Sequence, residues 1–374
     1  MDQETAKALF EKGAFLLFLN APKCLEFGID HNSWKTGPKF MGVKLIPPGL
    51  HFVYYSTSDK SGSSGLRSGF FKFYEYKEVF IVEWDYIIED IKFEDELDND
   101  QNERLKSGAY PLVPPTNWQK WRNLTNYITP RLISMILTNK GRVTNTASST
   151  VDEEELQQID NISRFEKEND KILFTKIDFK RSWRPGAVGM EVTKYSQDKS
   201  WLLINLLQKV YNNDYKEVLG ELQLSFVCLL MAQNYAGLIQ WKNIVQLICS
   251  SKEALETYAE TFYNEFFDVI QFQLEECPND FFEDLTYENN FLIHAIKTLH
   301  SNIIDIANTM ELNSLQRPKK LHALKRRLEK FRGFVNKKFN WDIVKYKNEG
   351  GIEYENYEEY TEEGEYAPVV VELP

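Results

Sequence analysis

Apolar residues in the first quarter of the chain occur in short runs that suit β-strands rather than helices. Residues 14–19 form a continuous apolar run, which is typical of a strand buried on both faces. Residues 49–55, 69–76 and 79–84 follow, dense in Phe, Tyr and Val, with Gly, Pro and Ser between them. This close spacing predicts a compact β-sandwich or a barrel-like domain.

A helical pattern closes the predicted domain. Over residues 117–137, large apolar side chains recur at helical spacing, at Trp118, Trp121, Leu124, Ile128, Leu132 and Ile136. Pro130 interrupts the pattern and should kink or break the helix, because proline lacks an amide donor. We therefore assign residues 1–137 to a β-rich N-terminal domain with a closing helix.

The stretch that follows is polar. Residues 138–170 are rich in Asn, Thr, Ser, Asp and Glu and have few large apolar side chains, which indicates a flexible linker. Residues 171–193 form a connecting segment. Within it, residues 172–179 alternate in a way that predicts a late strand, which could return to the first sheet.

Helical periodicity dominates from about residue 194. Residues 201–211 are apolar nearly all round, which suggests a buried helix. Further helical patterns continue to about residue 340, without a repeat of roughly 33 to 47 residues that would indicate a solenoid. The chain is thus predicted to be an α+β protein in which residues 194–342 form a helical C-terminal domain.

The last predicted segment, residues 343–374, combines acidity with one apolar run. From Glu349 to the end it has nine Glu and no Lys or Arg. The apolar run consists of Val369, Val370, Val371 and Leu373, and β-branched residues favour an extended backbone. A strand this short needs an existing sheet edge, on its own protein or on a partner. A frayed terminus is the alternative.

Composition narrows the classes of partner. The chain has 374 residues, 14% of them aromatic, which is enough for about two folded domains. Its net charge of -12 makes a broad nucleic-acid surface unexpected, although a local basic patch is compatible with it. The apolar runs are too short to span a bilayer. Four scattered Cys without a CxxC pair favour a reducing compartment.

We predict no catalytic residue, metal site or cofactor. The five His form no HExxH motif and have no zinc-type spacing with Cys. The loop from Gly37 to Lys44 superficially resembles a phosphate-binding loop. It lacks the Gly-Lys-Ser/Thr ending, and Pro38 removes an amide donor that such a loop uses.

A basic helix is predicted near the end of the helical domain. Residues 317–338 hold ten Lys or Arg and one Glu along an apolar stripe, with Lys325, Arg326 and Lys330 as the candidate basic surface. Such a helix can bind RNA, anionic lipid or an acidic partner. It can equally be the last helix of a bundle with a solvated face, or match the charge of the acidic tail.

A Ser-Ser turn is the candidate regulatory site. Ser250 and Glu253 match a capping box at the start of a helix near residue 254. The default role of such a box is structural. Phosphate on Ser250 or Ser251 would nevertheless change the local charge strongly, so both are candidate phosphorylation switches.

Several long motifs together resemble one family. They are Glu26-Phe-Gly-Ile-Asp30-His-Asn-Ser-Trp34, Gly37-Pro-Lys-Phe-Met-Gly-Val-Lys44, Val218-Leu-Gly-Glu-Leu-Gln223, Leu247-Ile-Cys-Ser-Ser251 and Ala367-Pro-Val-Val-Val-Glu-Leu-Pro374. With them the chain resembles the Aar-two splicing-factor family over nearly its whole length, apart from residues 94–107, 138–170 and 349–366.

The resemblance implies a β-rich domain, a linker and a helical bundle of the VHS type. It implies a non-enzymatic factor that assembles the U-five small nuclear ribonucleoprotein (snRNP) and blocks premature association of its helicase. The partner would be the large spliceosomal scaffold protein, bound through its RNase-H-like and Jab/MPN-like domains, with residues 369–373 paired to a scaffold strand. Such a protein is expected in cytoplasm and nucleus, without direct contact to nucleic acid or membrane.

Two other functions are compatible with the sequence. One is a VHS-like membrane-traffic adaptor that binds anionic lipid or cargo, because the basic helix could face a membrane. The other is an enzyme whose site is assembled only by the fold, which would be recognised by a deep pocket with perturbed ionisable groups.

Overall fold

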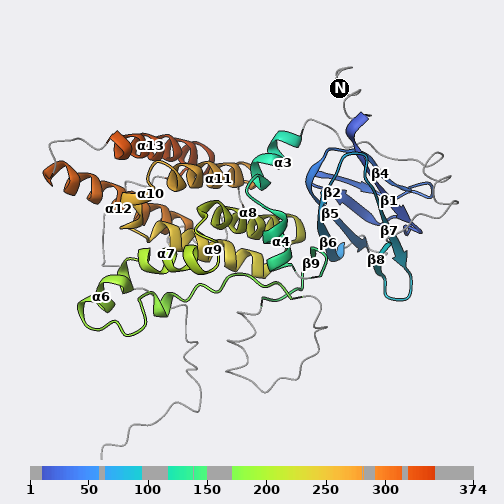
Figure 1. The fold of residues 1–374 in the computed structure, drawn as a ribbon. Coiled ribbons are helices and arrows are strands. Elements are labelled where there is room, and N and C mark those ends of the chain that lie inside the picture. Colours follow the sequence, from blue (N-terminus) through green and yellow to red (C-terminus); the bar gives the residue numbers. More distant parts are fainter. Residues whose placement is uncertain are drawn as a thin grey trace, which may run out of the picture.

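Two β-sheets pack face to face over the first part of the chain. The computed structural model describes residues 11–58, 64–94, 117–137, 139–149, 171–279, 281, 291–313 and 319–341. The strands are β1 (Ala14–Leu19), β2 (Glu26–Ile29), β3 (Asn32–Lys35), β4 (Gly42–Ile46), β5 (Gly49–Ser58), β6 (Ser64–Tyr74), β7 (Val79–Asp85), β8 (Asp90–Glu94) and β9 (Arg142–Thr144). One sheet has the order β4-β1-β7-β8 and the other β3-β2-β5-β6-β9, with β1 and β7 parallel (Figure 1). The predicted sandwich is confirmed.

The second sheet is apolar on both faces because both are covered. Val53, Tyr55 and Phe70 point toward the first sheet and join its core. Phe52 and Tyr54, at the alternate positions of β5, point to the other side and pack against helices. This double burial explains why residues 49–55 read as an almost unbroken apolar run rather than as an alternating one.

Two short helices follow the sheets, α3 (Trp118–Thr125) and α4 (Pro130–Ile136). The break expected at Pro130 is confirmed, since Pro130 occupies the first turn of α4, where its missing amide is not needed. Thr129 caps this helix by accepting the Leu132 amide at 3.2 Å.

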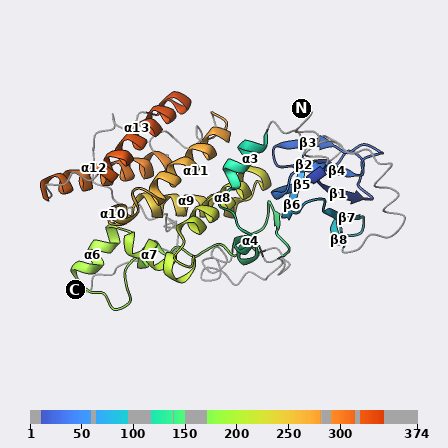
Figure 2. The same cartoon turned by 45° about the horizontal axis from the view of Figure 1, so that its top comes forward.

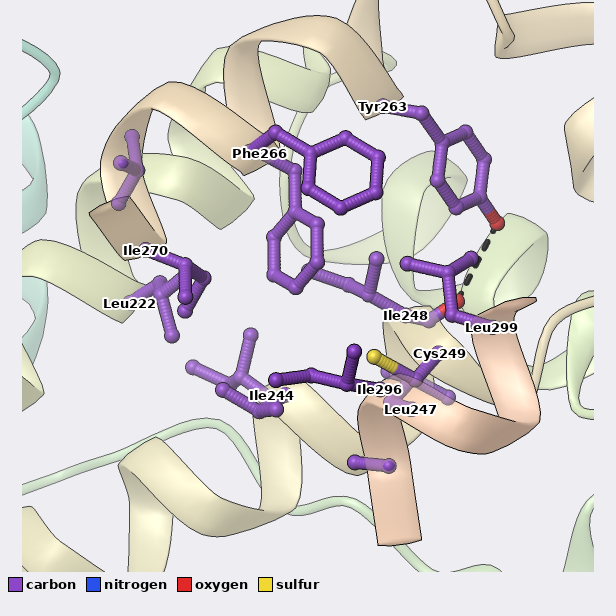
Figure 3. Close-up of a cluster of buried hydrophobic side chains, with 14 of the residues drawn as sticks. Leu222, Ile244, Leu247, Ile248, Cys249, Tyr263, Phe266, Ile270, Ile296 and Leu299 are labelled. Carbon is purple, nitrogen blue, oxygen red and sulfur yellow. Dashed lines mark hydrogen bonds between the residues drawn. The ribbon is translucent and has the colours of Figure 1, made fainter. Parts of the chain in front are cut away.

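The remaining helices form the C-terminal region, as predicted for this α+β chain. They are η3 (Phe179–Arg181), α6 (Met190–Gln197), α7 (Ser200–Lys209), α8 (Tyr215–Ala232), α9 (Tyr235–Cys249), α10 (Ala254–Tyr258), α11 (Phe262–Glu276), α12 (Phe291–Asn313) and α13 (Lys319–Phe339). Figure 3 shows side chains of α8, α9, α11 and α12 meeting in one cluster, among them Leu222, Ile248, Phe266 and Leu299. Burial of this cluster stabilises the region.

One hydrophobic cluster joins the sheets to the helices. It combines Phe52 and Phe71 of the second sheet with Leu132 of α4 and Val227 of α8. Helices α3, α4 and α8 therefore lie between the sheets and the other helices (Figures 1 and 2). The Trp121 indole of α3 donates to the Leu50 carbonyl at 2.7 Å. The two helices that replace the predicted closing helix, α3 and α4, thus pack against both the second sheet and α8.

The segment around the predicted linker differs from the prediction. Within residues 138–170, β9 is ordered and pairs antiparallel with β6. Residues 172–179 form no strand of either sheet, because Ile172 makes only an isolated bridge with Ser149. The Leu173 amide donates instead to the Ile136 carbonyl of α4 at 2.8 Å. The alternation of this segment reflects an extended chain with one side packed on helices.

Candidate partner-binding surfaces

The predicted tail strand lies outside the described residues. Val369, Val370, Val371 and Leu373 all belong to the part of the chain beyond residue 341. Their pairing with a scaffold strand stays a prediction from the sequence.

The turn that carries Ser250 and Ser251 connects α9 to α10. Ser250 ends α9, where its amide donates to the Gln246 carbonyl at 2.9 Å, so it does not cap the following helix. The Ser251 hydroxyl is buried and donates to the Leu247 carbonyl at 2.7 Å. Tyr263 of α11 donates to the carbonyls of Ser251 and Ile248, the latter drawn in Figure 3. The predicted capping box is wrong.

The start of α10 is held by Asp198 instead, a residue that sequence reasoning missed. Its two carboxylate oxygens accept the amides of Lys252 and Glu253, each at 3.0 Å. The neighbouring Ser200 hydroxyl accepts the Ala254 amide at 3.0 Å. These groups are more than 50 positions apart in the sequence. A capping motif searched for within four consecutive residues cannot find them.

This turn is also connected to other helices by charge. Glu253 pairs with Lys194 of α6, and Lys252 pairs with Asp305 of α12 at 2.9 Å. The Lys199 amide donates to the Ser250 carbonyl at 3.0 Å. The turn is therefore a junction of α6, α7, α9, α10 and α12, and Ser250, which is partly exposed, is its accessible serine.

Helix α13 places its cations in two groups. Leu324, Leu328, Phe331 and Val335 are buried in the helical core. Arg327 faces α11 and donates to Asp268 at 2.5 Å, so it holds the helix in place. Arg326 and Lys330 are exposed and Lys325 is partly buried, and within the described residues none of the three has an ion-pair partner. Of the candidate basic surface, Arg326 and Lys330 therefore face solvent, and its role stays a prediction.

The buried polar groups His51 and Asp30 make hydrogen bonds that stabilise the fold. His51 lies between Asp30, at 2.6 Å from its Nδ1, and the Pro47 carbonyl, at 2.8 Å from its Nε2. Asp30 also accepts the Phe52 amide at 3.0 Å. This pair fixes the turn between β2 and β3 against β5.

The buried cysteines are unreactive as thiolates. Burial raises the pKa of Cys277 to about 12 and that of Cys228 and Cys249 further, so these thiols stay protonated at neutral pH.

Neither a cluster of metal ligands nor a membrane-spanning helix is present among the described residues. No group of three or more His, Cys, Asp or Glu in this part of the chain is placed to hold a metal ion. Among the described helices, none combines the length and apolarity needed to cross a membrane.

Comparison with known proteins decides the family. A family model described as the AAR2 N-terminal domain matches residues 12–138, and one described as the AAR2 C-terminal repeat region matches residues 174–344. The AAR2 homolog of Homo sapiens is 31% identical over 100% of this chain and 97% of its own length. The chain belongs to the AAR2 family of splicing factors.

Other AAR2 proteins extend the match. The AAR2 homolog of Caenorhabditis elegans is 32% identical over 91% of this chain and 97% of its own length. The A1 cistron-splicing factor AAR2 of Saccharomyces cerevisiae is 26% identical over 76% of this chain and 83% of its own length. The resemblance drawn from the sequence motifs is confirmed, and the two family models together cover strands β1 to β8 and the described helices.

Proposed function

We propose that this chain is a non-enzymatic assembly factor of the U-five snRNP. It binds the large spliceosomal scaffold protein through the RNase-H-like and Jab/MPN-like domains and keeps the particle in a precursor state. While bound, it blocks premature association of the helicase, by occupancy rather than by chemistry. It acts in cytoplasm and nucleus. The observation that carries the proposal is the match to a splicing-factor family along the whole chain.

The first experiment measures binding of the full-length chain to a recombinant fragment that contains both scaffold domains. Addition of the helicase should compete with the chain for this fragment. An absence of binding, or simultaneous binding of chain and helicase without competition, would contradict the proposal.

The terminal strand is the proposed contact with an edge strand of the scaffold. Removal of residues 366–374 should weaken scaffold binding about tenfold or more, because several backbone hydrogen bonds and alternate side-chain pockets are lost together. The thermal midpoint of the free chain should not change. A large fall in that midpoint would mean that the strand pairs with its own protein.

Proline substitutions sharpen this test. On an added strand, alternate amides face the partner, so proline is tolerated at one position and not at the next. Val370→Pro and Val371→Pro should therefore differ clearly in affinity for the scaffold fragment. Equal effects of the two substitutions would argue against strand pairing and for a simple apolar contact.

Phosphate on Ser250 is the proposed release signal. A dianion there would add charge to a turn that already holds the carboxylates of Asp198 and Glu253. A partner surface in contact with this turn would then meet either repulsion or the cost of desolvating the phosphate. Ser250→Glu should weaken binding of the RNase-H-like domain while circular dichroism shows an intact fold. Ser251 is 1% exposed, so Ser251→Glu is expected to disrupt the helical core and does not test release. Unchanged affinity of a folded Ser250→Glu variant would exclude the switch.

The membrane-adaptor alternative rests on Arg326 and Lys330 of α13, which face solvent. Sedimentation with vesicles rich in phosphatidylserine separates the two functions. We expect the chain to stay in the supernatant. Binding that disappears in a variant combining Arg326→Glu with Lys330→Glu would favour the adaptor instead.

A further inference from the structure

The hairpin between β7 and β8 exposes three consecutive large apolar side chains. Tyr86 is 65% exposed, Ile87 92% and Ile88 51%. The hairpin projects from one end of the sandwich (Figure 1). Other exposed apolar residues in the described part of the chain do not form such a continuous group. An apolar cluster held in water marks a contact surface.

The tip is closed by hydrogen bonds to the side chain of Asp85. Asp85, at the end of β7, accepts the Ile87 amide at 2.7 Å and the Ile88 amide at 3.4 Å. Its other carboxylate oxygen pairs with Lys92 across the hairpin. A turn closed by an aspartate in this way has little freedom to fold its apolar side chains back onto the protein.

The base of the tip is anchored on the second sheet. Asp90 accepts from Tyr55 of β5 and from Arg142 of β9, the latter at 2.9 Å. Arg142 also donates to the Ile91 carbonyl at 2.9 Å, which ties the edge strand β8 to β9. The tip is thus fixed at both ends, and a rigid anchor loses little conformational entropy when it binds.

The charge around the tip indicates the kind of partner. Asp85 and Asp90 are each matched by a cation, Lys92 and Arg142. Glu89 is exposed and, among the described residues, has no ion-pair partner, so the tip carries one uncompensated negative charge. That charge, on a chain of net charge -12, opposes approach to an anionic membrane and favours a protein surface with a cation.

We propose that the hairpin tip is a second anchor for the protein partner, separate from the terminal strand. Ile87 enters an apolar pocket on that partner, Tyr86 and Ile88 pack against its walls, and Glu89 meets a Lys or Arg at its rim. This inference rests on the proposed function, because the partner is the scaffold protein named there. Apolar anchors of this kind dominate the affinity of many interfaces.

Two tyrosines allow a matched test. Tyr86 at the tip and Tyr76 in the turn before β7 are 65% and 67% exposed, and they lie at opposite ends of that strand. In the full-length chain, Tyr86→Asp and Ile87→Asp should each weaken binding of the two-domain scaffold fragment about tenfold or more. Tyr76→Asp should change the affinity less than about twofold. All three should keep the parent's thermal midpoint, because the side chains are exposed.

A photocrosslinker at position 87 tests the same contact without relying on a loss of affinity. Ile87→p-benzoylphenylalanine should crosslink to the scaffold fragment at an apolar pocket with a basic rim. The same replacement at Tyr76 should give no crosslink.

The outcomes separate this inference from the proposed function. If the parent binds the scaffold but both tip variants bind equally well and position 87 gives no crosslink, the anchor is wrong and the proposed function stands. If the parent does not bind the scaffold at all, both are wrong. If Ile87→Asp instead abolishes binding to phosphatidylserine vesicles, the tip is a membrane contact and the protein anchor is wrong.

Discussion

Glu221 is a fully buried carboxylate of α8 that is satisfied by neutral donors. It accepts from the amide and the hydroxyl of Thr175, from the Tyr211 hydroxyl and from the Gln240 amide, each at 2.8 Å. Burial raises its pKa, and these hydrogen bonds oppose that effect. Glu221 thereby connects α8 to three other parts of the chain: the extended segment at Thr175, the residue Tyr211 after α7, and α9 through Gln240.

Removal of this carboxylate should be costly. Glu221→Ala leaves the buried donors of Thr175, Tyr211 and Gln240 without an acceptor, so the free energy of unfolding should fall by about 3 kcal/mol. Glu217→Ala, one turn earlier on α8, removes a surface pair with Arg131 and should cost less than about 1 kcal/mol. Urea denaturation measures both. Equal losses for the two variants would show that the buried network contributes little.

At the scale of elements, the turn between α9 and α10 depends on residues from another loop. Asp198 provides the acceptors that the start of α10 needs, although Ser250 and Glu253 resemble a local capping box in the sequence. The two explanations make opposite predictions about which side chain matters.

Asp198→Ala should lower the free energy of unfolding by about 2 kcal/mol, because it removes the acceptors for three amides and one hydroxyl. Ser250→Ala should cost less than about 0.5 kcal/mol, since that side chain caps no helix. Hydrogen exchange at the Lys252 and Glu253 amides provides a local measurement and should accelerate only in Asp198→Ala. A larger loss in Ser250→Ala would restore the capping box.

Elements whose pattern is local could be predicted, and those that depend on distant partners could not. The apolar run of β5 and the break at Pro130 follow from neighbouring residues, and the structure has both. Residues 142–144 lie in a largely polar stretch that gave no sign of a strand, because β9 is stabilised by pairing with β6, about 75 positions earlier. The exposure of Ile87 could not be predicted either, because three consecutive apolar residues after a strand, here residues 86–88, are usually buried.

On the scale of the whole molecule, a polar contact also connects the sheets to the helices. His31, in the turn between β2 and β3, has its Nε2 atom 3.3 Å from Glu276 at the end of α11. Lys120 of α3 lies 3.4 Å from the other oxygen of Glu276. His31, and then Lys120, lower the pKa of Glu276, which therefore favours its ionised form in the folded chain.

This pair predicts a pH-dependent contribution to stability. Because the folded pKa of Glu276 is lowered, its contribution is present above its ordinary pKa of 4.5 and is lost as the pH falls below that value. Glu276→Gln should cost up to about 1 kcal/mol at pH 7 and nothing near pH 3. Glu275→Gln is the neighbouring control. Urea denaturation across this pH range would contradict the pair if the Glu276→Gln difference were constant.

The shared hydrophobic cluster predicts that the two regions do not separate when the chain is cut between them. A protease site inserted between Gln157 and Gln158 allows the folded chain to be cleaved after purification. Phe52 and Phe71 of the second sheet remain buried against α4 and α8, so the two fragments should elute together from a sizing column. They should also unfold in one transition, because unfolding of either region exposes the apolar face that the other region packs against.

An isolated fragment provides a second test. Residues 1–149 expressed alone carry the same apolar face without α8. This fragment should bind the dye ANS, and the cleaved complex should not. Fragments that part in native buffer, or a residue 1–149 fragment that stays monomeric and does not bind the dye, would show that each region has a complete core of its own.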